Sequence, residues 1–465
     1  MRTLLMLSCG HRPFVSAGVG TDVGKSATTT AKMSGFKQEK HAQLMIPGPI
    51  EISDDGKARA HRRLSHVLLA VQVLTTKWTR SLVRERAPVH VARLACLRPC
   101  LWCASHAPTG AVSCEAERLH TDEQDCLRGL RKVVFTDKAQ PFILAGSGTL
   151  GWDLVAANLI EPDERALVLN SGYFGDSFAD CLETYGAHVD QVKAPAVGGV
   201  APLDEVEKRL KEAQYKLVTF THVDTSTGVL SDAKQIGELV KRVSPDTLVV
   251  LDGVCSVASE EIRMDDWNID AVVGASQKGL GVPPGLSVTV FSQRALAVVD
   301  ARKHKITSYF ANLKRWLPVM QSYEAGAPIY FATPSVQLIY ALQASLKSIL
   351  SSSTSLEDRF ESHKRASQRV KDAAQRLGFK QLAANRHEQA NGMTALWLPD
   401  GVAPATLVKA MSDRGCVIAA GLLPAHKTKY VRVGHMGISV LPGRDDIDKV
   451  IAALEGSWAE IQPSK

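Results

Sequence analysis

Short apolar runs alternate with helix-like segments over the part of the chain that follows Leu127, and this alternation restricts the fold more than any other feature. Each run has the length of a buried strand: Phe142–Ala145, Ala166–Leu169, Leu217–Phe220, Thr247–Leu251, Ala271–Val273 and Ser287–Phe291. The segments 202–213, 232–243 and 335–350 have the apolar spacing of helices. Strands that alternate with helices of this length predict an α/β domain with a largely parallel sheet.

The pattern changes beyond about residue 350. The segments expected there are an amphipathic helix at 355–376, strands near 393–398 and 430–433, and helices at 404–414 and 445–460. This mix predicts a smaller α+β domain. The chain has 465 residues, which is enough for two or three domains. We therefore expect a large domain at 44–350 and a small C-terminal domain at 351–465.

Residues 1–43 form a separate N-terminal segment. The first 35 residues hold four basic residues and one acid, which are Arg2, Arg12, Lys25, Lys32 and Asp22. A basic, acid-poor start rich in Ser, Thr and Ala is typical of a mitochondrial targeting segment. Two other readings stay open: a disordered tail, and translated upstream sequence with the true start at Met33, in which case a cytosolic protein is expected.

The net charge of +7 comes largely from one stretch. Between His61 and Arg98 there are eight Arg or Lys residues and one acid, and the rest of the chain is close to neutral. Basic residues are not interleaved with aromatic ones, so we expect no nucleic-acid partner. No uninterrupted apolar run approaches the roughly 20 residues that span a bilayer, so we also expect a soluble protein without membrane contact.

The stretch 68–123 has neither a helical nor a strand period. It is rich in Arg and Cys, and the five cysteines in or near it are Cys96, Cys100, Cys103, Cys114 and Cys126. The spacing of the first three, with His106, fits no standard zinc site, and a second ligand pair is missing, so we expect no metal. The composition favours translated intron or a mis-assembled gene model, with a genuine inserted loop as the alternative.

Lys278 lies in the most informative string of the sequence. Ser276-Gln-Lys-Gly279 follows a short β-run and is itself followed by Gly281-Val-Pro-Pro-Gly285. A loop restricted by glycines and prolines can hold an amine where a cofactor aldehyde reaches it. The ordinary alternative is a surface lysine at the end of a strand.

Two further strand ends carry polar residues. Asp252 follows Leu248-Val-Val-Leu251, at the carboxyl edge of a parallel sheet, where ligands bind in such folds. An acid there can hold the proton of a pyridinium ring, although it can also cap the next helix. Gly146-Ser-Gly-Thr149 follows another strand and opens a helix, so its backbone amides could cradle a phosphate.

Taken in order, these strings and several others resemble the class V aminotransferases, in particular the alanine–glyoxylate (serine–pyruvate) group. The other matching strings are Pro47-Gly48-Pro49, Asn170-Ser-Gly-Tyr-Phe174-Gly175, Thr221-His-Val-Asp-Thr-Ser226-Thr-Gly228, Tyr330-Phe-Ala-Thr333-Pro334 and Val431-Arg432-Val-Gly434. The resemblance covers residues 44–52 and about 126–460. It implies the fold-type I transferase architecture, with a mostly parallel seven-stranded sheet, and pyridoxal 5′-phosphate as the cofactor.

The resemblance also implies roles for individual residues. Lys278 would form the internal aldimine with the cofactor and move the proton of the substrate α-carbon, and Asp252 would pair with the pyridine nitrogen. Phe174 would stack on the ring, where relatives often have Trp, and Ser226 would lie near the phenolic oxygen. The phosphate would be held by Ser147, Gly148, Thr149 and Gln277, with Tyr330 and Thr333 reaching over from the other subunit of a homodimer.

Substrate binding is implied at two positions. Arg432 would take the substrate carboxylate in a bidentate pair, and the backbone of Gly48 would approach the same group. The expected reaction is transamination of alanine, or of serine, with glyoxylate, which gives pyruvate or hydroxypyruvate and glycine. The alternatives are a serine–pyruvate aminotransferase and an inactive cofactor-binding relative disabled by the 68–123 stretch.

A cysteine desulfurase of the same fold is a further alternative. Such enzymes need a reactive loop cysteine, and Cys416, in Arg-Gly-Cys416-Val-Ile, reads instead as part of a buried strand. The sequence leaves two cellular locations open for the protein, mitochondria and the cytosol. A peroxisomal location follows only from family analogy, because the sequence ends in Gln-Pro-Ser-Lys465 without the final Leu of a peroxisomal address.

Overall fold

The computed structural model describes residues 43–46, 109–327, 329–351 and 355–462. Residues Gln38–Lys465 form one compact unit. Several expectations lie outside the described residues: the targeting segment, the approach of Gly48 to the substrate, most of the 68–123 stretch, and the cluster of Cys96, Cys100, Cys103 and His106.

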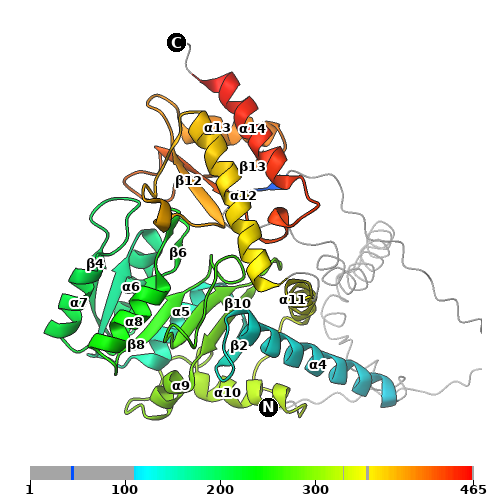
Figure 1. The fold of residues 1–465 in the computed structure, drawn as a ribbon. Coiled ribbons are helices and arrows are strands. Elements are labelled where there is room, and N and C mark those ends of the chain that lie inside the picture. Colours follow the sequence, from blue (N-terminus) through cyan, green and yellow to red (C-terminus); the bar gives the residue numbers. More distant parts are fainter. Residues whose placement is uncertain (1–42, 47–108, 328, 352–354, 463–465) are drawn as a thin grey trace, which may run out of the picture. The chain divides into compact units, whose positions relative to one another are not determined.

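A seven-stranded sheet forms the centre of the larger part of the fold (Figure 1). Its order is β2 (Gln140–Ala145), β10 (Leu286–Phe291), β9 (Ala271–Ala275), β8 (Leu248–Asp252), β5 (Leu217–Thr221), β3 (Arg165–Asn170) and β4 (His188–Lys193). Strand β10 is antiparallel to both neighbours, and the other pairs are parallel. The predicted mostly parallel sheet of seven strands is confirmed.

Six of these strands coincide with the predicted apolar runs, and β4 is the one that was missed. Strand β4 lies at the edge of the sheet and has the sequence His-Val-Asp-Gln-Val-Lys, in which only Val192 is buried. An edge strand that faces solvent needs few apolar residues, so the apolar pattern of β4 was too weak to predict a strand there.

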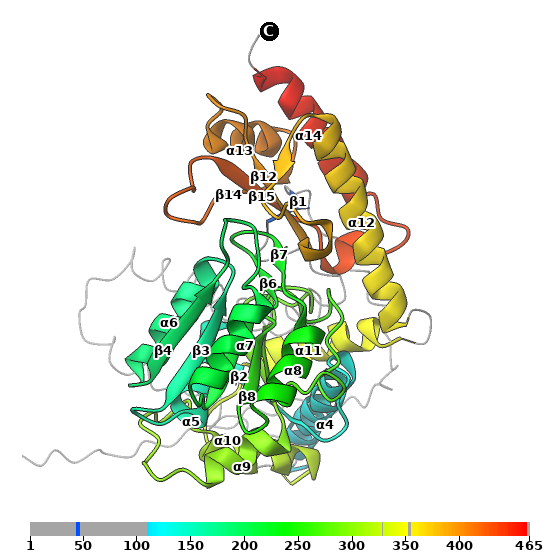
Figure 2. The same ribbon diagram turned by 60° about the vertical axis from the view of Figure 1, so that its left-hand side comes forward.

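Helices follow most strands and cover the sheet. They are α5 (Thr149–Leu159), α6 (Tyr173–Thr184), α7 (Leu203–Glu212), α8 (Ala233–Val243), α9 (Gln293–Asp300) and α10 (Leu313–Glu324). Figure 2 shows α7 and α8 on the near side of the strands, and the two helices pack against each other. Helix α8 begins where the Asp232 side chain accepts a hydrogen bond from the backbone N–H of Gln235 (2.9 Å), and it buries Ile236 and Val240.

The expectation that residues 68–123 lack any regular structure is wrong for the last part of that stretch. Residues 109–123 belong to α4, a 25-residue helix from Thr109 to Val133. Its second half buries Cys126, Leu130 and Val133 at helical spacing, and it packs on α11 (Val336–Ile349) and α10. The helical period is clear only in this second half, so reading residues 109–123 by themselves concealed it.

The C-terminal part contains α12 (Leu356–Arg376), α13 (Pro404–Asp413) and α14 (Asp446–Ile461), and a four-stranded sheet. That sheet has the order β11 (Lys380–Gln381), β12 (Met393–Trp397), β15 (Tyr430–Gly434) and β14 (Ala419–Ala420). Shorter elements are β1 (Gln43–Leu44), β6 (Val223–Asp224), β7 (Val229–Leu230), β13 (Cys416–Val417), η1 (Arg386–Glu388) and η2 (Gly437–Val440). These helices and the longer strands coincide with the predicted ones.

Buried apolar side chains form separate clusters. The largest draws its fully buried members from residues between Cys126 and Ile349. The second contains Met45 and residues between Ala366 and Trp458. The predicted domain boundary between residues 350 and 351 falls between these two sets and remains a prediction.

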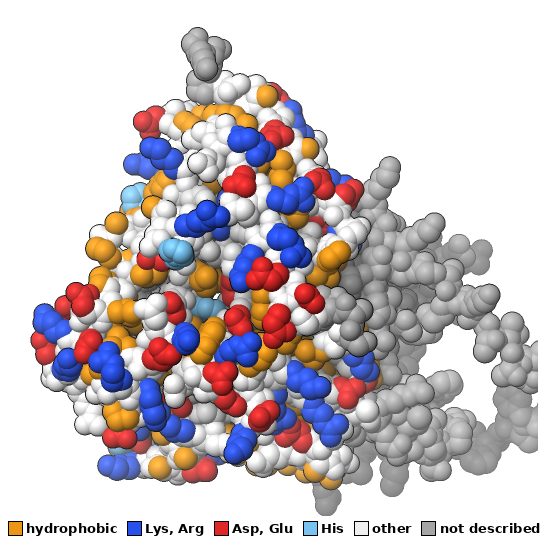
Figure 3. Space-filling view, in the orientation of Figure 1, with side chains coloured by type: hydrophobic (Ala, Val, Ile, Leu, Met, Phe, Trp, Pro, Cys, Tyr) orange, Lys and Arg blue, Asp and Glu red, His pale blue; other side chains and the backbone are white. Residues whose placement is uncertain are grey.

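The surface drawn in Figure 3 mixes acidic and basic side chains. Two ion pairs link α12 to α14: Arg369 with Asp448, and Arg376 with Glu455 at 3.2 Å. Exposed pairs of this kind contribute at most about 1 kcal/mol each, so apolar burial between the helices dominates their packing. Among the described residues, no helix combines the length and the apolar character needed to cross a membrane.

Candidate active site

A cavity of about 180 Å³ lies where the carboxyl ends of the central strands meet the start of α5. Residue Thr221 of β5 pairs with Asp252 of β8, so both strand ends open at the same edge. The described residues that line the cavity are Ser147, Gly148, Thr149, Trp152, Phe174, Thr221, Val223, Thr225, Asp252, Val254, Cys255, Gln277 and Lys278.

Lys278 lies in a tightly held loop after β9. The Ser276 hydroxyl donates to the Pro283 carbonyl (2.8 Å), and the Gly281 N–H donates to the Lys278 carbonyl (2.8 Å). The lysine side chain is buried, and this burial lowers the pKa of its amine, with a further decrease from the nearby charge of Arg432. A lysine with a lowered pKa is more often neutral, and only the neutral amine attacks a carbonyl or takes up a proton.

Asp252 lies fully buried at the end of β8. Its carboxylate accepts hydrogen bonds from the Trp152 indole N–H (3.2 Å) and the Val254 backbone N–H (3.1 Å). Burial raises the pKa of Asp252 to about 6 in spite of these two donors. A buried carboxylate held in this way is stabilised by a cationic partner, and a protonated ring nitrogen is such a partner.

The start of α5 provides the opposite end of the cavity. Gly148 occupies the N-cap position, and a Cβ atom there would lie 2.8 Å from Val254 and 3.3 Å from Ala275. Glycine is therefore required for the close approach of this turn. Backbone N–H groups at a helix start bind anions, as a phosphate cradle needs. The buried Gln277 Oε1 has no hydrogen-bond partner among the described residues.

Aromatic side chains pack along the same wall. Trp152 stacks on Phe178, with ring centroids 5.3 Å apart, and meets Phe174 edge to face at 6.3 Å. Phe174 was predicted to line the site, and Trp152 was missed. The sequence could have indicated Trp152 as a lining residue. Trp152 follows Thr149 by three residues in a helix, so the two side chains lie on the same helix face.

Ser226 does not line the cavity, although it was expected near the cofactor. Its hydroxyl donates to the Asp224 carboxylate (2.5 Å) and accepts from the Tyr173 backbone N–H (3.0 Å). The neighbouring Thr225 lines the cavity in its place. Ser226 is fully buried and connects the β6 strand to the start of α6.

The remaining predicted residues that the structure describes do not line the cavity of their own chain. Arg432 is half-buried, and its guanidinium donates to the carbonyls of Ala420 (2.9 Å) and Thr225 (3.2 Å). Because Thr225 lines the cavity, Arg432 is held at the cavity's edge. Tyr330 is 79% exposed and shares a hydrogen bond with Thr333 (3.2 Å).

Comparison with known proteins agrees with this geometry. The class-V aminotransferase family model matches residues 109–455. The chain belongs to this family. The match starts at Thr109 and so includes residues 109–123.

Individual class-V aminotransferases resemble the chain over most of their length. Alanine–glyoxylate aminotransferase 1 of Saccharomyces cerevisiae is 42% identical over 320 residues, which cover 67% of this chain and 82% of the yeast protein. L-aspartate–glyoxylate aminotransferase of Paracoccus denitrificans is 31% identical and covers 67% of this chain and 77% of its own. The crystal structure of alanine–glyoxylate aminotransferase from Nostoc sp. has a TM-score of 0.71 at 23% identity, and the alignment covers 90% of this chain and 96% of that one.

Class-V aminotransferases depend on pyridoxal phosphate, and the cavity fits that group. Lys278 offers an amine for the aldehyde, Asp252 a carboxylate for the ring nitrogen, and the start of α5 a cradle for the phosphate. The Gln277 Oε1 atom, which has no partner among the described residues, would be satisfied by a hydrogen-bond donor of a bound ligand. When bound, the cofactor supplies an electron sink and carries the amino group between substrates.

Cys416 and Cys255 do not support desulfurase chemistry. Cys416 is buried in β13, which pairs with β1, and it does not line the cavity. Cys255 does line the cavity, but burial raises the pKa of its thiol to about 12. A thiol with this pKa is protonated at neutral pH, whereas the nucleophile is the thiolate.

Proposed function

We propose that the chain transfers the amino group of alanine, with serine as a second donor, to glyoxylate and releases pyruvate or hydroxypyruvate and glycine. The observation that carries this proposal is the 42% identity to the yeast alanine–glyoxylate aminotransferase. The Paracoccus relative is named for aspartate and glyoxylate, so the two relatives share the acceptor and differ in the donor.

The charges around the cavity favour a donor with one carboxylate. Lys278 is the only cationic side chain among the described residues that line the cavity, and Arg432 lies at its edge. Arg432 would bind the α-carboxylate of the donor through its planar guanidinium. A donor with a second carboxylate needs a second cation, which supports alanine and serine over aspartate.

The proposed residue roles follow from the same contacts. Lys278 would hold the cofactor covalently, and its Nζ would then take the proton from the α-carbon of the donor. Asp252 would hold the ring N–H, and Trp152 and Val254 fix the orientation of its carboxylate. Ser147, Gly148, Thr149 and Gln277 would hold the phosphate.

We also propose a homodimer in which the subunits complete each other's sites. Large apolar side chains are exposed close to Tyr330 in the sequence, and they are Tyr309, Phe310 and Ile329. Aromatic residues are enriched in the cores of protein interfaces, which supports an interaction surface here. In such a dimer Tyr330 and Thr333 would reach the phosphate in the partner's cavity.

A donor panel with glyoxylate as the fixed acceptor tests the reaction. Alanine is expected to give the highest rate of glycine formation, serine a lower one and aspartate the lowest. The variant Lys278→Ala should lower the alanine rate by at least about 10²-fold and remove the visible absorption of the bound cofactor. The matched control Lys208→Ala, at an exposed position on α7, should behave as wild type.

Two outcomes would contradict the proposal. A higher rate with aspartate than with alanine would reject the donor assignment but leave the aminotransferase in place. A protein that binds the cofactor through Lys278 but turns over none of the donors would support the inactive-relative alternative.

A further inference from the structure

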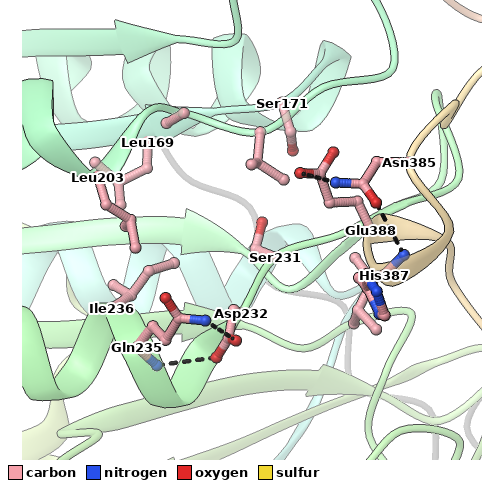
Figure 4. A pocket seen from close by; sticks show the side chains of 13 residues that line it. Leu169, Ser171, Leu203, Ser231, Asp232, Gln235, Ile236, Asn385, His387 and Glu388 are labelled. Atoms are coloured by element: carbon pink, nitrogen blue, oxygen red, sulfur yellow. Dashed lines mark hydrogen bonds between the residues drawn. The ribbon is translucent and has the colours of Figure 1, made fainter.

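A second cavity, of about 500 Å³, shares no lining residue with the catalytic one. It is enclosed by the end of β3, the starts of α7 and α8, and the short helix η1 (Figure 4). A volume of this size is typical of small-molecule sites, which are mostly apolar with a few placed polar groups.

The floor of this cavity is apolar except for one hydroxyl group. Leu169 and Ile236 are buried, and Leu203 is half-buried beside them. Ser171 is 6% exposed, and its Oγ has no hydrogen-bond partner among the described residues. Since an unsatisfied buried hydroxyl is costly, Ser171 calls for a ligand group that can accept or donate a hydrogen bond.

The rim of the cavity carries negative charge. Asp232 accepts hydrogen bonds from the backbone N–H (2.9 Å) and the side-chain amide (2.6 Å) of Gln235, and Glu388 accepts from the Asn385 side-chain amide (3.1 Å). These donors are neutral, and the start of α8 further stabilises the Asp232 carboxylate, so the two negative charges are only partly compensated. No Lys or Arg occurs among the described residues that line the cavity, and His387 is the one lining residue among them whose side chain can carry a positive charge.

We propose that this cavity binds a small organic cation with an apolar body. Its ammonium group would lie at the rim beside Asp232 and Glu388, and its apolar body would cover Leu169, Leu203 and Ile236. A polar group at the far end of the ligand would satisfy the Ser171 hydroxyl. The carboxylates, the apolar side chains and the hydroxyl group of the cavity thus match the ammonium group, the apolar body and the polar end of one ligand.

The two cavities share a wall, which restricts the choice of probe. The Ser231 hydroxyl lines the second cavity and donates to the carbonyl of Thr221 (3.0 Å), which lines the catalytic one. Ser171 lies three residues before Phe174 of the catalytic cavity. A primary amine would also react at the catalytic site, so the probe must be an amine that cannot condense with an aldehyde.

N,N-dimethyltyramine meets this condition, because it is a tertiary amine with an aromatic body and a terminal hydroxyl group. Titration calorimetry of the full-length holoenzyme should show saturable binding of one molecule per chain. The matched anion 3-(4-hydroxyphenyl)propionate, with nearly the same body, should not bind there. Equal binding of both compounds, or no saturable binding of the amine, would overturn the proposal.

Two variants test whether the amine binds in this cavity. Asp232→Asn combined with Glu388→Gln removes both charges, keeps the helix cap and the Asn385 contact, and should weaken binding by about tenfold. Leu203→Trp should abolish binding by filling the floor. Both variants should keep the wild-type rate of transamination, which shows that the protein is folded. Unchanged binding of the amine in both variants would reject this cavity as its site.

Discussion

Asp252 shows at the scale of one residue how burial prepares a group for its partner. Burial raises its pKa to about 6, so the carboxyl group is ionised above this pH and protonated below it. Only the ionised form pairs with a protonated ring nitrogen. The same burial that destabilises the charge in the empty site thus makes a cationic partner favourable.

The first prediction concerns this pKa. The affinity of the wild-type chain for its cofactor should fall as the pH is lowered through about 6, because Asp252 then becomes protonated. In Asp252→Asn the affinity should already be low at pH 8 and should show no step near pH 6, and the turnover should fall by about 10²-fold or more. Cofactor dissociation measured by fluorescence between pH 5 and 8 tests this.

Asp180→Asn is the matched control for the Asp252 variant, because Asp180 is an exposed carboxylate on α6. It should keep the wild-type affinity and the step near pH 6. A step that persists in Asp252→Asn would assign the titration to another group, for which Lys278 is the first candidate because burial also shifts its pKa.

Helix α12 connects the C-terminal part of the fold to the loop that contains Lys278 through one buried side chain. The guanidinium of Arg359 donates to the carbonyls of Ala258 (2.8 Å) and Gly279 (2.8 Å), and the side chain is 4% exposed. Burial lowers its pKa to about 10, which still leaves it charged at neutral pH. Gly279 follows Lys278 directly, so α12 helps to position the lysine that is proposed to hold the cofactor.

The second prediction concerns Arg359 of α12. Arg359→Met leaves two buried carbonyls without their donor, which should destabilise the protein by about 2–4 kcal/mol and speed cofactor release. Arg359→Lys can reach only one carbonyl and should give intermediate values. Thermal melting and the rate of cofactor release measure the two effects.

Arg369→Met on the same helix is the control for Arg359→Met. Its exposed guanidinium pairs with Asp448, and its loss should change stability by no more than about 0.5 kcal/mol. If both variants lower the melting temperature equally, the role assigned to Arg359 in positioning the lysine loop is wrong.

At the scale of the whole molecule, the third prediction concerns the proposed shared site. The Lys278→Ala and Tyr330→Ala variants should each have low transamination activity. The first lacks the lysine of its own cavity, and the second lacks the tyrosine that would reach into the partner's cavity. When both chains are produced together, mixed dimers should contain one site with both Lys278 and Tyr330. Co-production should therefore restore activity above the sum of the two separate variants.

Light scattering on the wild-type chain complements this experiment. A mass of twice the 50.3 kDa chain is expected. A monomer with full activity would contradict the shared site, and so would mixed dimers that are no more active than the separate variants.

The sequence by itself determined the class of the fold and named several of the residues that meet in the cavity. Strand-length apolar runs predicted six of the seven sheet strands, and Lys278, Asp252 and the Gly146–Thr149 turn followed strand ends that the fold brings to one edge. These signals are local, since each depends on a few consecutive residues and on the rule that parallel strands end on the same side.

Only the tertiary structure decided which side chains face the cavity. Trp152 and Thr225 line it and Ser226 does not. The Trp152 indole is oriented by a hydrogen bond to Asp252, and the Ser226 hydroxyl is held by the Tyr173 backbone N–H and by the neighbouring Asp224. The tertiary structure likewise joined residues 109–123 to α4 and assembled the second cavity from four separate segments. Contacts between residues far apart in the chain leave no local pattern, so a reading of consecutive residues cannot show them.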